Sequence, residues 1–296
     1  MEQQNDRLIQ GMTGNGEFRI IAAQTTHTIE TLRLRVDLSP LATDALGRAM
    51  TGAVLLARLL DKQLSEQRVT LRFEGGGPIG LLIAEGTSSG EARGFVANPQ
   101  IAEPGLSVGE AVGSEGMLTV IRGTQPDGKP YTSQVELVSG EIARDLAHFL
   151  LSSEQVTSAV LLGVMNRREG VAAAGGMIVQ AFPHATEASL ERMENAIRKT
   201  TSFSALLSKM SIDEAVGTVL QDVGYRPLDA SFDVPLRFRC SCSRERAFAP
   251  LTIFSPDELW EMIRNEGGSE VTCQYCGARY QFTPGELEML AKPPDA

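Results

Sequence analysis

The hydrophobic and polar positions of residues 16–182 predict a domain that mixes strands with helices. Short runs rich in β-branched and other apolar residues, bounded by turn residues, predict strands. In LRLRV, at residues 32–36, apolar and charged positions alternate strictly, which is the period of a half-buried strand. The predicted strands lie at 16–26, 32–36, 69–86 (two strands around a glycine turn), 91–99, 117–124, 131–139, 157–166 and 171–182.

Two helical segments are predicted within the same region. The first opens at Ser39-Pro40 and runs from Leu41 to about Gln63, with proline in its first turn. Small residues recur along it, which indicates close packing: Ala42, Ala45, Gly47, Ala49, Gly52 and Ala53. The second helix, at 141–155, carries one apolar face formed by Ile142, Leu146, Phe149 and Leu150. These elements predict an α+β domain that ends near Pro183 and contains a buried central helix.

The pattern becomes helical throughout residues 185–224. Apolar side chains recur at helical spacing, and Ser211 with Glu214 forms a capping box for a further helix. The apolar positions are Leu190, Met193, Ile197, Phe203, Leu206, Leu207 and Met210. Because short isolated helices are marginal in water, this segment must dock on a neighbour. It is either a permanent connector or a segment that is released when a neighbour loosens.

The C-terminal residues predict a small module. VPLRFRCSC at 234–242 predicts a strand, Ser255-Pro256 begins a helix that runs through Ile263, and Thr283-Pro284 begins a last helix. The predicted core of the module is Phe248, Phe254, Trp260 and Tyr280. The 296-residue chain is thus predicted to contain a mixed α+β core domain at 1–183, a helical linker at 184–231 and a small four-cysteine domain at 232–296.

All four cysteines of the chain fall in this module. Cys240 and Cys242 form C-x-C, and Cys273 and Cys276 form C-x-x-C, with no histidine between the pairs. Two close pairs of thiolates suit a tetrahedral Zn²⁺ ion, so a zinc site with all four as ligands is predicted. The alternatives are two disulfides, in one of three pairings, or four free buried thiols. We expect reduced thiols, because no signal peptide is recognised and cytosolic thiols stay reduced.

The one-residue spacer of C-x-C holds its two thiolates close together on extended backbone. A disulfide between Cys240 and Cys242 would close a small, strained ring, and strained disulfides are labile. This spacing favours a site that comes apart. Four arginines flank the pair: Arg237, Arg239, Arg244 and Arg246. Either they offset the negative charge of a zinc ion with four thiolates and keep the sulfurs ionised, or they are solvated side chains on a strand edge.

Charge and composition argue against several other functions. The net charge of −10, from 27 basic and 37 acidic residues, argues against nucleic acid as a partner. No apolar run approaches the roughly twenty residues of a membrane span, so we expect no membrane partner and a cytoplasmic location. EGGGPIG at 74–80 predicts a tight hairpin and lacks the features of a phosphate-binding loop. His27, His148 and His184 suggest no catalytic site, so no enzyme is predicted.

Several segments resemble one known family. FRCSCSRER and VTCQYCGARYQF around the cysteines are similar to the redox-regulated holdase chaperones, the thirty-three-kilodalton heat-shock protein family. EGGGPIG, VSGEIARDLAHFLLSSEQ at 138–155 and AAGGMIVQ at 173–180 resemble the N-terminal domain of that family. The resemblance covers nearly the whole chain, and no cysteine departs from the family pattern.

The resemblance implies an ATP-independent chaperone that is inactive while reduced and zinc-bound. Oxidation of the cysteines by peroxide or hypochlorous acid would release zinc, unfold the linker and expose apolar surface that holds unfolding client proteins. The resemblance also implies disulfides between Cys240 and Cys242 and between Cys273 and Cys276, and a homodimer as the active form.

Two other classes of protein remain as alternatives. A zinc-ribbon nucleic-acid binder would need a basic, aromatic-bearing face, which the charge balance disfavours. A thiol-disulfide oxidoreductase would carry C-x-x-C at the start of a helix, whereas Cys273 follows a predicted strand and Cys276 precedes Gly277.

Overall fold

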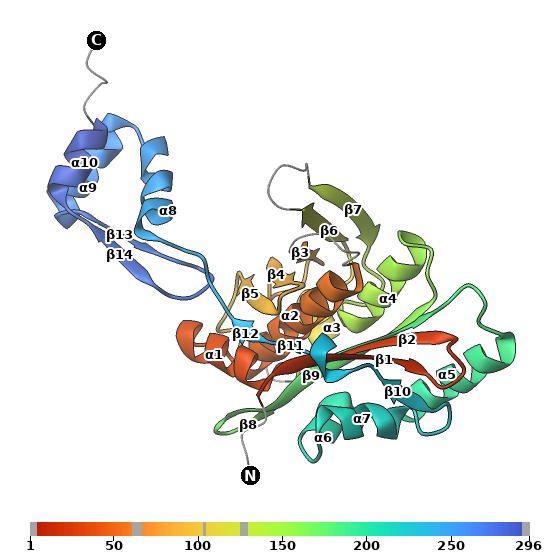
Figure 1. Cartoon of the computed structure of the whole chain (residues 1–296). Helices are drawn as coiled ribbons and strands as arrows, with labels where there is room; N and C mark the ends of the chain where they lie inside the picture. The colour runs from red at the N-terminus through yellow and green to blue at the C-terminus, as the bar shows by residue number, and fades with distance from the viewer. Residues whose placement is uncertain (1–4, 61–66, 103–104, 125–129, 292–296) are drawn as a thin grey trace. The chain divides into compact units, whose positions relative to one another are not determined.

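The computed structural model describes residues 5–60, 67–102, 105–124 and 130–291, and the chain divides into two compact units between Arg239 and Cys240. The larger unit is built from two six-stranded sheets (Figure 1). The first sheet has the order β10-β1-β2-β9-β8, with β11 also paired to β1. Its strands are β1 (Arg7–Thr13), β2 (Phe18–Gln24), β8 (Ser158–Arg167), β9 (Gly170–Ala181), β10 (Tyr225–Pro227) and β11 (Val234–Pro235).

The second sheet has the order β12-β5-β4-β3-β6-β7. Its strands are β3 (Gln67–Glu74), β4 (Leu82–Thr87), β5 (Glu91–Val96), β6 (Met117–Thr124), β7 (Tyr131–Glu136) and β12 (Arg237–Phe238). All neighbouring pairs are antiparallel except β12 with β5, which is parallel. The strands predicted from 16–26 and from 69 onward correspond to β2 to β9. Strand β1 was not predicted, and neither was the short helix α3 (Val108–Val112).

Helix α2 (Pro40–Leu60) contacts strands of both sheets and forms the centre of the larger unit. Its small residues allow the backbones to approach closely, because a Cβ atom at Gly86 in β4 would lie 2.4 Å from the Val54 nitrogen. Leu46, Leu55 and Leu56 are fully buried along its length. The prediction of a buried central helix is confirmed, although its predicted end at 61–63 lies outside the described residues.

Residues 32–36 are helical, so the strand predicted there is wrong. They belong to α1 (Thr26–Val36), in which Ile29 and Leu32 are buried while Leu34 is 67% exposed. The buried carboxylate of Asp6 accepts hydrogen bonds from the backbone N–H groups of the first turn, at His27 and Thr28. An N-terminal cap of this kind satisfies donors that have no partner within the helix. The alternation of leucine and arginine in LRLRV therefore does not match which residues are buried, because Leu32 is buried and Leu34 is exposed.

The glycine-rich segment between β3 and β4 forms a turn, as predicted, and packs against α3. A Cβ atom at Gly75 would lie 2.1 Å from the Gly113 carbonyl oxygen, and one at Gly77 would lie 2.3 Å from that of Ala111. The backbone N–H of Gly77 donates to the Val112 carbonyl at 3.0 Å. The glycines thus serve close backbone packing. Helix α4 (Ala143–Ser152) confirms the second predicted helix, with Leu146 and Phe149 buried.

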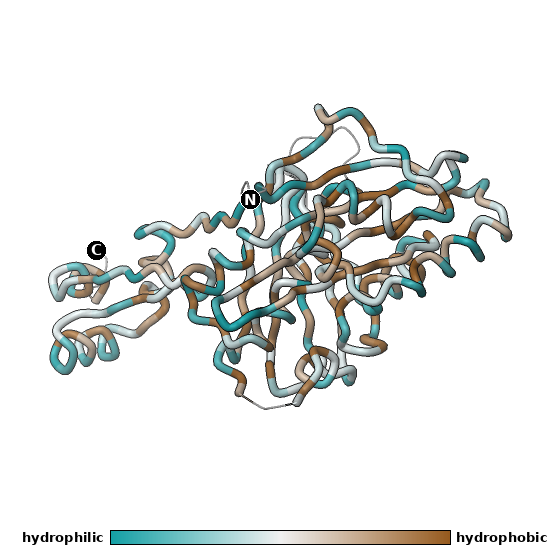
Figure 2. The backbone as a smooth tube through the Cα atoms, turned by 90° about the horizontal axis from the view of Figure 1, so that it is seen from below, coloured by the Kyte–Doolittle hydropathy of each residue, from teal (hydrophilic) through white to brown (hydrophobic). Residues whose placement is uncertain are grey.

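Three helices cover the outer face of the first sheet: α5 (Glu187–Lys199), α6 (Phe203–Leu207) and α7 (Ile212–Val219). Their buried side chains, including Met193, Phe203 and Val216, form one hydrophobic cluster with Ile20 and Met177 of the sheet. In Figure 2, hydrophobic positions recur along the strands and along the helices that cover them. The capping box predicted at Ser211 and Glu214 is present.

Residues 234–238, which the sequence analysis assigned to the C-terminal domain, form β11 and β12 in the larger unit. Before them lies a short 3₁₀ helix, η1 (Ala230–Phe232). The Arg7 guanidinium, at the start of β1, forms ion pairs with Asp233 and with Asp213 of α7. The larger unit therefore includes the helical segment and the strand that follows it.

The smaller unit contains a two-stranded sheet and three α-helices among the residues described after 239. The elements are α8 (Arg244–Phe248), η2 (Ala249–Ile253), α9 (Pro256–Glu266), β13 (Ser269–Thr272), β14 (Arg279–Phe282) and α10 (Pro284–Ala291). The helix starts predicted at 255–256 and 283–284 are confirmed, the first with a capping box between Ser255 and Glu258.

The core of the smaller unit differs from the prediction. Its buried residues are Leu251, Leu259, Cys276, Phe282, Leu287 and Ala291. Phe248 and Tyr280 pack against this cluster as predicted, but Trp260 is 36% and Phe254 is 40% exposed. Helix α9 turns Leu259 inward, which directs the adjacent Trp260 away from the core.

We predict that Leu55→Ala destabilises the larger unit by about 2–5 kcal/mol, because it removes a fully buried side chain and leaves a cavity. The measurement is the midpoint of urea unfolding, monitored by circular dichroism. Leu34→Ala is the matched control and is expected to change stability by less than about 0.5 kcal/mol, because Leu34 is exposed. Equal effects of the two changes would contradict the assigned burial.

Candidate metal centre

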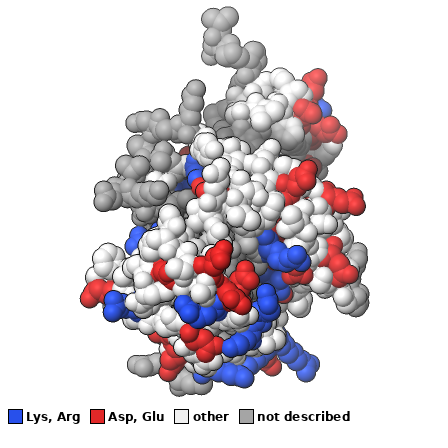
Figure 3. All heavy atoms as spheres, turned by 90° about the vertical axis from the view of Figure 1, so that its right-hand side faces the viewer, with Lys and Arg blue, Asp and Glu red and all other residues white. Residues whose placement is uncertain are grey.

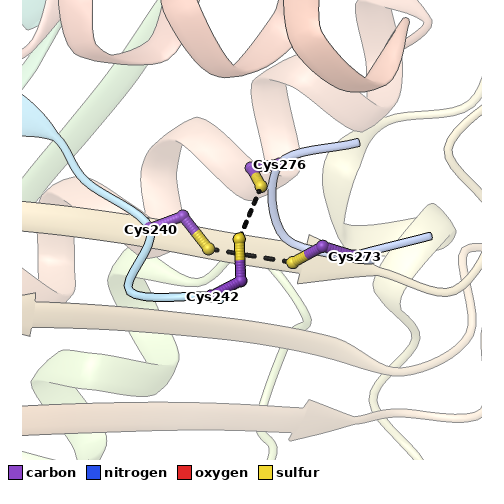
Figure 4. A group of neighbouring side chains, drawn as sticks. All are labelled: Cys240, Cys242, Cys273 and Cys276. Atoms are coloured by element: carbon purple, nitrogen blue, oxygen red, sulfur yellow. Dashed lines mark hydrogen bonds between the residues drawn. The ribbon is translucent and has the colours of Figure 1, made fainter. Parts of the chain in front are cut away.

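The four cysteines lie on two loops of the smaller unit (Figure 4). Cys240 and Cys242 lie on the extended segment between β12 and α8, and Cys273 and Cys276 lie in the turn between β13 and β14. In that turn the Cys273 carbonyl accepts hydrogen bonds from the backbone N–H groups of Cys276, at 3.3 Å, and Gly277, at 2.8 Å. Gly277 has a φ of 70°, a conformation that glycine adopts without strain. The turn directs both of its sulfurs toward the other loop.

The four sulfur atoms converge. All lie within 4.8 Å of one another, with 3.8 Å between the sulfurs of Cys240 and Cys273 and 3.3 Å between those of Cys242 and Cys276. A tetrahedral site with zinc–sulfur bonds of about 2.3 Å separates its sulfurs by about 3.8 Å. A disulfide would require about 2.05 Å, and the four cysteines are free thiols. The donor set therefore fits a tetrahedral thiolate site, and the two-disulfide alternative is not the state of this structure.

Tyr280 contributes to the site in a way that sequence analysis missed. It was predicted only as a core residue, but its hydroxyl donates a hydrogen bond to the Cys242 sulfur at 3.1 Å. The pairing of β13 with β14 sets Tyr280 opposite Val271, two residues before Cys273. A tyrosine four residues after the second C-x-x-C cysteine was the available signal, but spacing alone does not reveal where a hydroxyl points.

The surroundings of the thiols shift their pKa values in opposite directions. Burial opposes ionisation of Cys242, but hydrogen bonds from Tyr280 and from the neighbouring thiols outweigh it and lower the pKa of Cys242 to about 7. Burial raises the pKa of Cys276, and its hydrogen bond with Cys242 raises it further. Cys242 therefore ionises more readily than Cys240 and Cys276, whose pKa values are raised, and the thiolate is the form that binds a metal.

The four arginines near the first pair have different partners. Arg237 and Arg239 both form ion pairs with Glu91 in the larger unit. Arg244 pairs with Glu286, donates to the Gln281 carbonyl and lies 4.5 Å above the Phe282 ring. Arg246 donates to the carbonyl and hydroxyl oxygens of Ser241, between the first two cysteines, at 2.8 and 2.9 Å. These partners are carboxylates, carbonyl and hydroxyl oxygen atoms and an aromatic ring, and Arg246 binds the residue between Cys240 and Cys242.

Histidine, cysteine and acidic side chains can all bind metal ions. Within the described part of the chain, the group of such side chains placed to hold an ion consists of the four cysteines. His148 lies by Ser152, and His184 stacks on Phe182.

Among the described residues, no helix is both long enough and apolar enough to cross a membrane. Cys273 follows a strand and precedes a tight turn, unlike a cysteine at a helix start.

The fold and the site together define an α+β protein that carries a separate unit with four cysteines positioned to bind a metal ion. A family model described as Hsp33 protein matches residues 6–283, so the chain belongs to this family. This finding confirms the family resemblance inferred from the sequence motifs.

Relatives and a solved structure agree with this assignment. The chain is 46% identical to the 33 kDa chaperonin of a strain of Thermus thermophilus, over 96% of this chain and 86% of the relative. It is 38% identical to the 33 kDa chaperonin of Deinococcus radiodurans, over 96% and 97% of the two chains. The crystal structure of the 33 kDa chaperonin of Thermotoga maritima superposes with a TM-score of 0.87 at 34% identity, covering 97% of this chain and 98% of that chain.

We predict that the reduced protein binds one Co²⁺ ion with the intense charge-transfer and visible bands of a tetrahedral thiolate site, because four converging sulfurs favour that geometry. The measurement is an absorption titration of the metal-free protein. Cys276→Ser is expected to weaken the bands and change their shape, since one sulfur donor is lost. The matched control Ser241→Ala, between two cysteines, should keep the four-sulfur spectrum.

Proposed function

We propose that this protein is a redox-regulated, ATP-independent holdase chaperone, inactive while reduced and zinc-bound and activated by oxidation of its cysteines. The observation that carries the proposal is the convergence of four free thiols in one small unit of a chain that belongs to the Hsp33 family. The relatives named 33 kDa chaperonin support a chaperone function. The proposed metal is zinc, bound by Cys240, Cys242, Cys273 and Cys276.

Zinc would supply much of the stability of the smaller unit. The unit has few large buried side chains, of which Leu251, Leu259, Phe282 and Leu287 are the main ones among its described residues. Structural zinc contributes apparent binding free energies of about 10–16 kcal/mol in small modules at neutral pH. Loss of the ion would therefore remove most of what keeps the unit folded.

Peroxide would supply the signal. A cysteine thiolate attacks one peroxide oxygen, the O–O bond breaks, and the products are a sulfenic acid and a hydroxide that takes up a proton to become water. A second thiolate then attacks the sulfenic sulfur, forms the S–S bond and expels hydroxide. Each disulfide thus consumes one peroxide and withdraws two sulfurs from metal binding. Cys242, with its pKa lowered to about 7, ionises more readily than Cys240 and Cys276 in the metal-free form.

Helices α5 to α7 are the proposed responsive segment. In the folded chain their apolar side chains, such as Met193, Phe203 and Ile212, pack on the first sheet. Their release would expose both this helical face and the sheet beneath it, and large exposed apolar surfaces bind other apolar surfaces. The alternative, a permanent connector, would leave this surface covered after oxidation. The segment at 184–231 is therefore proposed as the linker between a client-binding domain and a redox-sensing one.

The same proposal includes a cytoplasmic location, unfolding proteins as clients, a homodimer as the oxidised form and no enzymatic activity. A nucleic-acid partner is disfavoured by the net charge of −10. On the face of the molecule shown in Figure 3, basic and acidic side chains are interspersed, which differs from the single-sign patches of nucleic-acid interfaces.

We predict that peroxide at mild heat releases zinc and suppresses client aggregation with the same time course. Zinc is followed with a chromogenic chelator, and aggregation of an unfolding client is followed by light scattering in the same tube. Because zinc loss is proposed to unfold the smaller unit, the reduced zinc form should suppress aggregation poorly and the oxidised form without ATP should suppress it well. If zinc is released with no gain in holding activity, the metal has only a structural role.

The control for this experiment is a variant with all four cysteines changed to serine. It should bind no zinc and should give the same aggregation curve with and without peroxide. A peroxide response in that variant would show that other residues carry the redox signal.

We also predict that mass spectrometry of the oxidised protein finds disulfides between Cys240 and Cys242 and between Cys273 and Cys276. Proteolysis at Arg244, Arg246 or Arg264 separates the two cysteine pairs, so each peptide should carry an internal disulfide. All four sulfurs lie within 4.8 Å of one another, so crossed pairing is also within reach. Peptides joined between Cys240 or Cys242 and Cys273 or Cys276 would contradict the proposed pairing.

A further inference from the structure

Residues 234–239, here called the docked strand, pair with the edges of both sheets of the larger unit. Val234 and Pro235 pair with Leu8 and Arg7 of β1. Arg237 and Phe238 pair in parallel with Glu91 and Ala92 of β5. The backbone N–H groups of Arg237 and Arg239 donate to the carbonyl oxygens of Gly90 and Ala92, both at 3.0 Å. The docked strand therefore satisfies backbone groups that an edge strand otherwise exposes.

The side chains of the docked strand make a specific set of contacts with β5 and α1. The Glu91 carboxylate, only 16% exposed, accepts hydrogen bonds from Arg237, at 2.7 Å, and from Arg239. Burial opposes ionisation of Glu91, but these two hydrogen bonds outweigh it and hold its pKa below the usual range. Between the two arginines, Phe238 packs on the core beneath the Arg35 guanidinium, 5.2 Å from its ring centre. The β5 edge thus accommodates a strand whose successive side chains are basic, apolar and basic.

The backbone at this edge is shaped for close approach. Gly90 has a φ of 90°, and a Cβ atom there would lie 2.1 Å from the Pro235 carbonyl oxygen. A pocket of about 400 Å³ runs beside the docked strand, lined by Asp6, His27, Thr31 and residues 235–238. The Gly90 backbone therefore allows a strand to approach closely, and unfilled space lies between the docked strand and the start of α1.

We propose that the β5 edge is a binding site for extended segments of client proteins, and that the docked strand occupies this site until the smaller unit unfolds. The inference rests on the proposed function. Arg239 directly precedes Cys240, so unfolding of the smaller unit removes the folded structure that follows the docked strand. What then holds β12 is its short pairing with β5, the packing of Phe238 on the core, and ion pairs whose arginines are mostly exposed. Exposed ion pairs contribute little, and a two-residue strand pairing is short.

The chemistry of the edge selects its ligand. An extended chain that adds to a sheet edge gains affinity from backbone hydrogen bonds and specificity from alternate side chains. Here Glu91 selects arginine or lysine at two alternate positions, and the core beneath selects an aromatic or aliphatic side chain between them. Unfolded chains expose such extended segments, whereas folded proteins keep their apolar positions buried.

The test uses the full-length protein and two photoreactive peptides. The first has the sequence of residues 230–239, with benzoylphenylalanine at the position of Phe238. The second is identical except that the arginines at positions 237 and 239 are glutamate. In the oxidised, zinc-free protein, we expect the first peptide to crosslink to residues 90–96 at least five-fold more than in the reduced zinc form, and at least five-fold more than the second peptide.

Two variants of Glu91 separate charge recognition from a loss of folding. In Glu91→Lys the preference should reverse, so that the glutamate peptide crosslinks more strongly to the same residues. Glu91→Gln keeps the size of the side chain and should bind both peptides about equally. Circular dichroism checks that each variant is folded. Crosslinks outside residues 90–96, or a preference that is the same in all three proteins, would overturn the proposal.

Zinc release and client aggregation are measured on the same samples, which separates the two hypotheses. If oxidation releases zinc and suppresses aggregation without crosslinks at the β5 edge, the edge is not the client site and the holdase proposal stands. If zinc release brings no suppression, the holdase proposal fails. If the peptide still crosslinks to β5 when zinc release brings no suppression, the edge binds peptides, but its assignment as a client site is overturned.

Discussion

The convergence of four sulfur atoms from two loops is the constraint on which the smaller unit depends. The loop with Cys240 and the turn with Cys273 come from segments far apart in the sequence, and the core beneath them is small. A metal ion would link the loops through bonds that exist only while the sulfurs are thiolates. With the metal bound, the folding of this unit would be tied to the chemical state of four sulfur atoms, and a reaction at sulfur would change its stability.

The larger unit is built on a different principle, because its stability comes from extensive apolar burial. Helix α2 is enclosed by two sheets, and its small residues let both sheets approach closely. Helices α5 to α7 lie on the outside of one sheet with a smaller hydrophobic cluster of their own. A central layer and a peripheral layer therefore coexist in one unit, and the peripheral helices are joined to the cysteines through residues 225–239, whose strands pair with both sheets. In the proposed mechanism, this difference would let helices α5 to α7 come off the sheet while α2 and the strands around it stay folded.

Several features could be predicted from the sequence because one local signal determined each of them. The cysteine spacing indicated the sulfur cluster, the small residues at 42–53 indicated a buried helix, and Ser211 with Glu214 indicated a helix start. Other features depended on distant partners. Residues 32–36 are helical because Asp6 caps α1 and the core takes Ile29 and Leu32. The hydrogen bond from Tyr280 to Cys242, and the pairing of residues 234–238 with β1 and β5, join positions whose proximity no local pattern reveals.

The pairing of the first strand with almost the last strand of the larger unit has a kinetic consequence. Arg7 pairs with Pro235, so this part of the β1 edge stays open until residue 235 has left the ribosome. Contacts of such high contact order form late, because a long loop must close before they contribute. A nascent chain therefore passes through a species in which the earlier strands of both sheets are available to pair, but β11 and β12 are missing. During its own synthesis the protein would transiently present the same uncovered edges that it is proposed to present under oxidative stress.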